Sequence, residues 1–174
     1  MADFPQISIL PVTTSGLTIS VGNSLVGMLG PTPSSVAWPS ANLALFVPVL
    51  VPQPVTVFRM TAGCGSGTGG NFDMGLYDSA GHLLVSSGAT ARSASSEVSV
   101  DVTDTRVGTG LFYLALSTDG VAAMYAAQAL GVQKCRLLGF LQMASAYPLP
   151  STATFAKCAT DYIPIVAAYL GPTT

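Results

Sequence analysis

Proline and glycine recur along the whole chain and divide it into short apolar segments. Of the 174 residues, 12 are proline and 18 are glycine, and the segments between them are rich in Val, Leu, Thr and aromatic residues. Both residues disfavour long helices, whereas short apolar runs bounded by turn residues are typical of strands. The sequence therefore predicts an all-β domain.

Seven apolar segments are spaced like the strands of an antiparallel β-sandwich. They cover residues 43–50, 55–62, 71–77, 82–87, 97–103, 111–118 and 121–128. In EVSVDVTD three valines alternate with polar residues, which predicts a strand with one solvated face. In LFYLALS both faces are largely apolar, so this strand is expected to lie centrally in a sheet or beneath a partner subunit.

The two ends of the chain are less regular. Residues 1–42 contain Pro11, Pro31, Pro33 and Pro39, which cannot donate to a sheet, and we interpret them as an arm or as irregular edge strands. Residues 43–174 form the predicted sandwich, with no linker dividing it. Within the last third, LLGFLQM is either a strand or a helical turn, and TFAKCATDYIPIVAAYL is expected to be extended.

The charge content is unusually low. Only 8% of the residues are charged, against about 25% in an average protein, while 49% are apolar and the net charge is -2. We therefore expect much of the surface to contact other protein. The chain has no basic cluster suited to nucleic acid. Its longest apolar run, LALFVPVLVP, is too short to cross a bilayer.

The compartment follows from the start of the chain and from its cysteines. The first residues, MADFPQIS, lack the pattern of a secretory signal, so folding in a cytoplasm is expected. Cys64, Cys135 and Cys158 show no CxxC spacing and no neighbouring histidine. We predict reduced, structural thiols and no zinc site.

The glycine-rich segment GCGSGTGG contains the spacing GxGxxG at Gly65, Gly67 and Gly70. In dinucleotide-binding folds that spacing precedes a helix. Here a strand is expected to follow, and no GK[ST] supplies a phosphate-binding lysine. The segment is interpreted as a flexible hairpin connection, with no nucleotide cofactor.

The stretch GNFDMGLYDSAGHLLVSSG holds the most distinctive polar residues. Alternation places Asp73 on a polar strand face, and Asp78 and Gly81 have the positions that a tight turn requires. Asp73, Asp78 and nearby carbonyls could be imagined as a calcium site, but they supply too few oxygens. Asp73, Asp78 and His82 are therefore expected to shape and solvate a hairpin.

Nothing in the sequence predicts an enzyme. His82 is the single histidine, and neither GxSxG nor HExxH occurs. Asp101 and Asp104 resemble a strand end entering a turn. Asp73 and Asp101 are the one carboxylate pair that we would test for polysaccharide hydrolysis. No catalytic, cofactor or metal residue is assigned.

Aromatic residues raise a different hypothesis, that of a sugar-stacking platform. Trp38, Tyr77, Tyr125 and Tyr147 could stack on a glycan if they were exposed. The competing interpretation, which we favour, places them in the core or in a subunit interface.

Two patterns carry a family resemblance. GNFDMGLYDSAGHLLVSSG and MASAYPLPSTATFA, within a stretch from Val36 to Leu170, resemble small virion proteins of tailed bacteriophages. The resemblance implies a jelly-roll-like β-sandwich in a virion assembled in the host cytoplasm. It carries over no catalytic residue.

The role implied by the resemblance is structural. We expect a capsid cement or decoration protein that binds the major capsid protein or another virion protein as a symmetric oligomer, most simply a homotrimer. In this view the N-terminal arm clasps a neighbour. The alternative is a receptor- or glycan-binding module on a tail or fibre. Neither role involves nucleic acid or a membrane.

Overall fold

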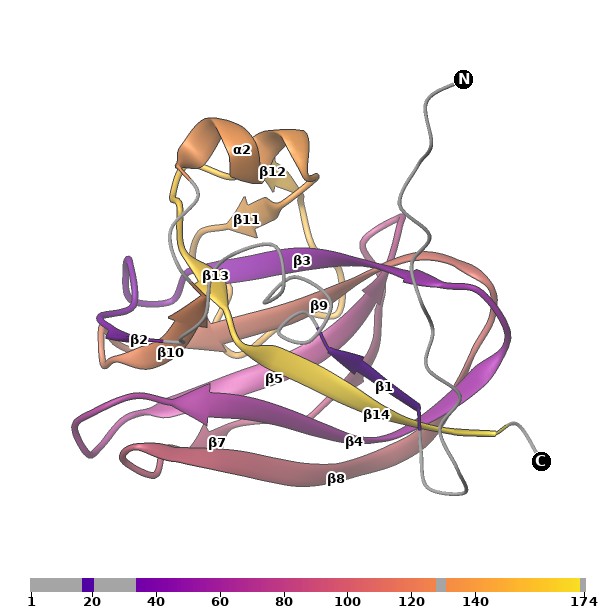
Figure 1. Cartoon of the computed structure of the whole chain (residues 1–174), viewed down its shortest axis with the longest axis horizontal. Helices are drawn as coiled ribbons and strands as arrows, with labels where there is room; N and C mark the ends of the chain where they lie inside the picture. The colour runs from indigo at the N-terminus through magenta and orange to yellow at the C-terminus, as the bar shows by residue number, and fades with distance from the viewer. Residues whose placement is uncertain (1–16, 21–33, 128–130, 173–174) are drawn as a thin grey trace.

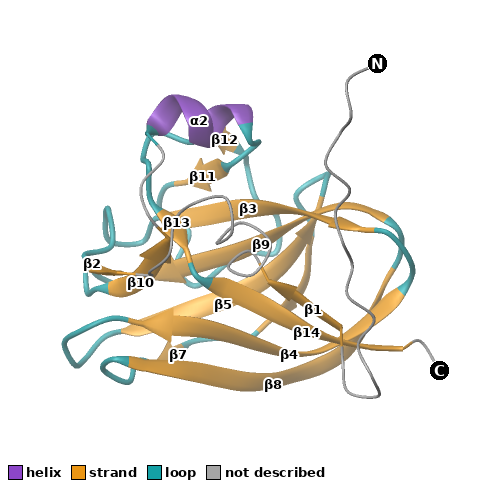
Figure 2. Cartoon of the chain, viewed as in Figure 1, coloured by secondary structure: helices purple, strands orange, loops and turns teal. Residues whose placement is uncertain are grey.

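The described part of the chain is almost entirely β-structure. A computed structural model describes residues 17–20, 34–127 and 131–172, which form fourteen strands and one short helix, α2 (Val132–Leu137). The strands make two antiparallel sheets packed face to face, as Figures 1 and 2 show. The predicted β-sandwich is thereby confirmed.

The first sheet, sheet A, is organised around the long central strand β4. Its strands are β1 (Leu17–Ser20), β2 (Ser34–Val36), β4 (Val55–Cys64), β8 (Ser96–Val107), β10 (Met124–Ala127), β13 (Ile163–Pro164) and β14 (Val166–Pro172). β4 pairs with β8 on one side and with β14 and the start of β10 on the other. β1 and β2 lie within the predicted arm and join this sheet at β14 and β10. Residues 37–42 of the arm are also described, and Trp38 among them is buried, whereas residues 1–16 and 21–33 lie outside the described residues.

The second sheet, sheet B, runs in the order β12-β11-β3-β9-β5-β6, with β7 also paired to β5. Its strands are β3 (Ala44–Val51), β5 (Asn71–Asp78), β6 (Leu83–Ser86), β7 (Thr90–Ala91), β9 (Gly110–Thr118), β11 (Leu141–Met143) and β12 (Ala156–Lys157). β9, the LFYLALS strand, lies between β3 and β5, which confirms its predicted central position.

One core lies between the sheets. Alternate residues of β3, β5 and β9 point into it, and they meet Val57, Met60 and Ala62 of β4 from the other sheet. On β8 the three valines pack against this core while the alternating polar residues stay exposed, as predicted. β8 is longer than predicted, however, and Asp101 and Asp104 lie within the strand rather than at its end.

The glycine-rich segment connects the two sheets. It joins β4 of sheet A to β5 of sheet B, so the predicted hairpin connection is wrong, although a strand does follow it. β4 cannot form a hairpin with β5 because β4 is already paired with β8 and β14 on its two edges. Sequence alone could not show this, because the competing pairings come from distant segments.

A second apolar layer covers the outer face of sheet B. Residues 144–155, here called the strap, cross this face and bury Phe46 and Tyr77 together with Leu149 and Ala153 of the strap itself. Phe155 packs on Tyr113 with 4.9 Å between ring centroids. The strap carries most of the MASAYPLPSTATFA pattern, so that pattern encodes a cover for a sheet that would otherwise expose apolar residues on both faces.

The segment between β10 and β14 also contains a small lobe, formed by α2, β11 and β12, which stands above β3 in Figure 1. LLGFLQM was predicted to be a strand or a helical turn, and it contains part of each: α2 ends at Leu137 and β11 begins at Leu141. The rest of the tail forms β12, β13 and β14, as expected for extended structure.

Candidate functional site

Asp73 is buried instead of solvated, contrary to its predicted place on a polar face. Only 1% of the residue is exposed. Its Oδ1 accepts hydrogen bonds from the hydroxyls of Ser86 at 2.6 Å and Ser87 at 3.3 Å, and its Oδ2 accepts one from the Leu149 amide at 3.0 Å. The Asp73 carboxylate joins the strap to the β5–β6 hairpin, which accounts for a polar side chain on the outer face of β5.

A buried hydroxyl lies across the ladder from Asp73. Ser117 of β9 is its register partner, and among the described residues Ser117 Oγ is the one buried side-chain oxygen or nitrogen without a hydrogen-bond partner. The alternation of LFYLALS already indicated which face Ser117 occupies. Its burial could not be seen there, because the strap that covers it lies more than twenty residues further along the chain.

Asp78 and His82 form the predicted turn. The Asp78 carboxylate accepts hydrogen bonds from the backbone amides of Ala80 at 2.9 Å and His82 at 2.8 Å, and it lies 3.0 Å from His82 Nδ1. These bonds, led by the one from the His82 amide, lower the pKa of Asp78. The carboxylate is used by the turn, while the His82 side chain is 63% exposed.

The turn is also fixed to the strap. Gly81 accepts a hydrogen bond from the Ala153 amide at 2.7 Å, and Leu83 donates one to the Ser151 carbonyl at 2.9 Å. Strap, turn and Asp73 therefore form one connected unit on the outer face of sheet B.

Arg92 is a buried cation that sequence reasoning missed. It is 8% exposed, and its guanidinium donates to the carbonyls of Gly69 and Ala123 and to the sulfur of Met124. The arginine thus fastens the glycine-rich loop to the start of β10. No pattern in the sequence signals this, because its acceptors are backbone carbonyls from two other segments.

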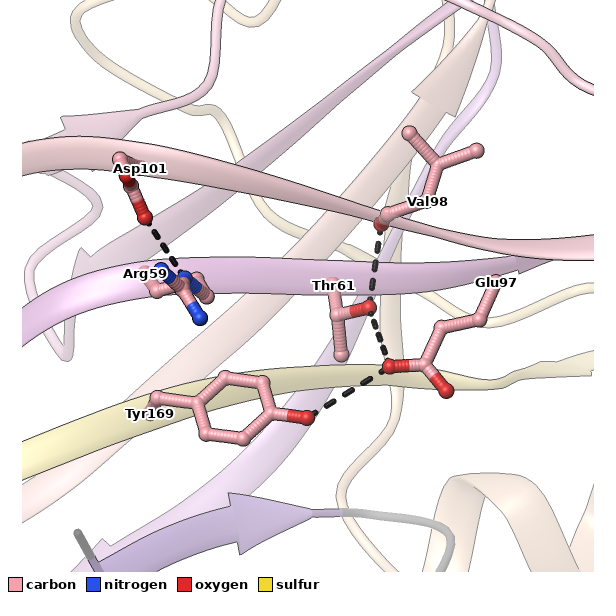
Figure 3. A network of polar contacts seen from close by, with 6 residues as sticks. All are labelled: Arg59, Thr61, Glu97, Val98, Asp101 and Tyr169. Carbon is pink, nitrogen blue, oxygen red and sulfur yellow. Dashed lines mark hydrogen bonds and ion pairs between the residues drawn. The ribbon is translucent and has the colours of Figure 1, made fainter. Parts of the chain in front are cut away.

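The outer face of sheet A carries a polar network, drawn in Figure 3. Arg59 Nε donates to Asp101 at 2.6 Å, and Thr61 Oγ1 donates to Glu97 and to the Val98 carbonyl, both at 3.0 Å. The hydrogen bond from Arg59 to Asp101 raises the pKa of Arg59. Each contact joins neighbouring strands, and none aligns a nucleophile with a base.

The candidate hydrolytic pair does not share a cleft. Asp73 lies on the outer face of sheet B beneath the strap, and Asp101 lies on the outer face of sheet A in the exposed pair with Arg59. A glycoside hydrolase needs its two carboxylates on opposite sides of one bond. The interpretation of Asp73 and Asp101 as such a pair is therefore wrong.

Two of the four aromatic residues considered for a sugar-stacking platform are buried. Trp38 is 1% exposed and donates to the Leu43 carbonyl, and Tyr77 is fully buried and donates to the Pro150 carbonyl. Burial raises the pKa of Tyr77 well above its ordinary value. Tyr125 and Tyr147 are half-buried. Trp38 and Tyr77 belong to the core, which is the interpretation that the sequence favoured.

The three cysteines are free and buried. Burial raises the pKa of Cys135 on α2 to about 11, and it also raises the pKa of Cys158. Thiols held in this way are poor nucleophiles. In the described ranges, no cluster of three or more His, Cys, Asp or Glu residues could hold a metal ion, and no helix is long and apolar enough to span a membrane.

The strongest surface feature is apolar. Among the residues that the structure describes, six large apolar residues are well exposed, and four of them are leucines: Leu50 and Leu111 on sheet B, and Leu137 and Leu138 at the end of α2. β3, β9, β11 and the strap contain no charged residue at all. This side of the molecule is suited to contact with another protein surface.

Comparisons with protein-family models, with curated proteins and with solved structures found no match to this chain.

Proposed function

We propose that this chain is a structural protein of a bacteriophage virion, and that it acts as a capsid cement or decoration protein without enzymatic activity. In this role it binds the major capsid protein or another virion protein and adds buried interface across subunits of the shell. The proposal draws its virion context from the sequence resemblance and its mode of action from the surface of the sandwich.

The observation that carries the mode of action is the apolar outer face of β3 and β9 in sheet B. A solvated face would alternate polar and apolar residues, as β8 does. β3 and β9 instead carry apolar residues on both faces, and Leu50 remains 68% exposed where the strap does not reach. Protein interfaces are depleted in charge at their centres and enriched in apolar contact.

The test is immunogold labelling of intact parent virions with an antibody against the purified protein. The proposal expects gold particles distributed over the capsid faces, with pre-immune serum as the control. Gold confined to the tail tip would contradict a cement role and favour the receptor-binding alternative. That alternative would then depend on Tyr125 and Tyr147, since Trp38 and Tyr77 are buried.

To test whether the arm clasps a neighbouring subunit, a deletion shorter than residues 1–42 is required. β1 and β2 pair with β14 and β10, so removal of all 42 residues would also remove two strands of sheet A. Deletion of residues 1–16 leaves both strands in place. We expect this variant to fold but to bind the shell weakly, and undiminished shell binding would contradict the clasp.

A further inference from the structure

The outer face of sheet A carries two tyrosines among its polar residues. The residues on either side of Tyr169 in β14, and on either side of Tyr125 in β10, belong to the core between the sheets. Because successive side chains of a strand point to opposite faces, both tyrosines point outward. Each is half-buried. These two rings therefore take no part in filling the core.

The strand register places both tyrosines along one side of β4. Tyr169 is the register partner of Arg59. Tyr125 lies beside Gly63, where a Cβ would be only 2.9 Å from Cβ and 3.1 Å from Cδ2 of the tyrosine, so the ring rests over this glycine. Gly63 and Arg59 are four residues apart, which is about 13 Å along a strand. The two tyrosines therefore belong to rows separated by about that distance.

Hydrogen-bonding side chains line the other side of β4. Glu97, Ser99 and Asp101 of β8 are the register partners of Gly63, Thr61 and Arg59, in that order. All three β8 residues are exposed. Figure 3 shows the three strands side by side, with the hydroxyl of Tyr169 directed across β4 toward Glu97. The face thus has an aromatic line and a polar line, with β4 between them.

The polar side chains retain unused hydrogen-bonding capacity. Glu97 accepts hydrogen bonds from Thr61 at 3.0 Å and from Tyr169 at 3.5 Å, both through Oε1. Asp101 accepts one from Arg59 Nε through Oδ1. Within the described part of the chain, Glu97 Oε2, Asp101 Oδ2 and the terminal nitrogens of Arg59 have no hydrogen-bond partner. Hydroxyl groups, which both donate and accept, match this set of acceptors and donors.

This combination of groups selects an uncharged carbohydrate. A sugar ring presents C–H groups on its faces and hydroxyls at its edges, so aromatic rings contact the faces while polar side chains bind the edges. The carboxylates of Glu97 and Asp101 outnumber the guanidinium of Arg59, so the site disfavours polyanions such as nucleic acid or acidic polysaccharide. Among the described residues, none of the six well-exposed large apolar side chains belongs to β4, β8 or β14. The site is therefore distinct from the apolar face of sheet B.

We propose that the outer face of sheet A binds a neutral oligosaccharide. Tyr125 and Tyr169 stack on its sugar rings. Glu97, Asp101 and Arg59 bind its hydroxyl groups. The inference goes beyond the proposed structural role and does not depend on it. A chain attached to a shell through sheet B would present this site outward, because the outer faces of the two sheets lie on opposite sides of the sandwich.

The first test is the binding of the labelled full chain to a printed array of neutral and acidic oligosaccharides. We expect the wild type to bind neutral glycans and Tyr169→Ala to bind them about tenfold more weakly. Tyr169→Phe keeps the ring and should bind like the wild type. Tyr147→Ala is the matched control, because Tyr147 is also half-buried but lies on the strap over sheet B. Fluorescence of Trp38 during urea unfolding confirms that each variant is folded.

Three results of the array would overturn the proposal. The first is a wild type that binds none of the glycans, and the second is binding confined to acidic glycans. The third is an equal effect of Tyr169→Ala and Tyr147→Ala, which would reject the face of sheet A as the site.

The second test measures the affinity for the best glycan of the array by isothermal titration calorimetry. Arg59→Ala and Asp101→Ala should each weaken binding about tenfold, whereas Lys134→Ala, which removes an exposed cation of α2, should not. The wild-type affinity should be the same at low and high salt, because screening does not act on a neutral ligand. Equal effects of Arg59→Ala and Lys134→Ala, or a steep salt dependence, would contradict the assignment. Both tests use the isolated chain, so their results are independent of where the protein lies in a virion.

Discussion

Asp73 shows how one residue can attach a long segment to a sheet. Its carboxylate accepts three hydrogen bonds from two segments, namely the end of the β5–β6 hairpin and the strap. A buried carboxylate is costly unless it is well hydrogen-bonded. The same bonds that satisfy Asp73 therefore bring the strap to the sheet.

Replacement of Asp73 by Asn should destabilise the protein by about 2 kcal/mol, because the amide keeps the volume but presents N–H groups to buried donors. Urea unfolding can be followed by the fluorescence of Trp38, the single tryptophan, which is buried. Hydrogen exchange at the Leu149 amide should also accelerate. Asp101→Asn is the control, and little or no loss of stability is expected from it, since its ion pair with Arg59 is exposed. Equal losses in the two variants would refute the role given to Asp73.

Asp78 should make the stability depend on pH in the acid range. The hydrogen bond from the His82 amide lowers the pKa of Asp78 in the folded chain below its ordinary value. Its contribution is therefore present above the unfolded pKa and is lost as pH falls through the folded pKa. The difference in unfolding free energy between the wild type and Asp78→Asn should be constant above about pH 5 and should shrink toward about pH 2. A difference that grows on acidification would contradict the assignment.

At the scale of elements, the strap and the β5–β6 hairpin behave as one unit. The strap continues the hairpin edge through the bridge between His82 and Thr152, and it covers the aromatic residues of β3 and β5. Gly81 lies where the two meet, with φ near 90°. A Cβ at this position would lie 2.5 Å from the Ala153 carbonyl oxygen.

Alanine substitutions at two glycines distinguish the cost of a clash with the strap from the cost of backbone strain. Gly67 has the same φ as Gly81, but a Cβ there would meet nothing within 4 Å. Gly67→Ala should cost only the strain, about 1 kcal/mol, whereas Gly81→Ala should cost about 3 kcal/mol because the strap must also shift. Urea unfolding of both variants measures the difference. Equal losses would show that the strap does not press on the turn.

At the scale of the whole molecule, the two sheets share a single core. Residues of β3, β5 and β9 pack against those of β4, β10 and β14 in one cluster, and the second, smaller cluster lies on the outer face of sheet B beneath the strap. The chain carries few charges, and the polar network of Figure 3 lies on sheet A, opposite the largely apolar outer face of β3 and β9 on sheet B.

The shared core predicts one cooperative unfolding transition for the described sandwich. Far-ultraviolet circular dichroism, which reports the strands, and Trp38 fluorescence, which reports the core, should give the same midpoint in urea. The measurement should be repeated at several protein concentrations, so that any effect of self-association is identified. Two separate midpoints at every concentration would show that the sheets unfold independently.

The sequence by itself determined the strands and their inward faces. Turn residues limited segment length, and alternation in EVSVDVTD fixed which side chains point inward, because both signals are local. In LFYLALS, where both faces are apolar, the pattern indicated only a central strand. The turn at Asp78 was equally visible for the same reason. Only the tertiary structure decided the rest. The burial of Asp73 depends on Leu149 of the strap, and Arg92 joins the glycine-rich loop to the start of β10. These contacts link distant segments, so no local pattern records them.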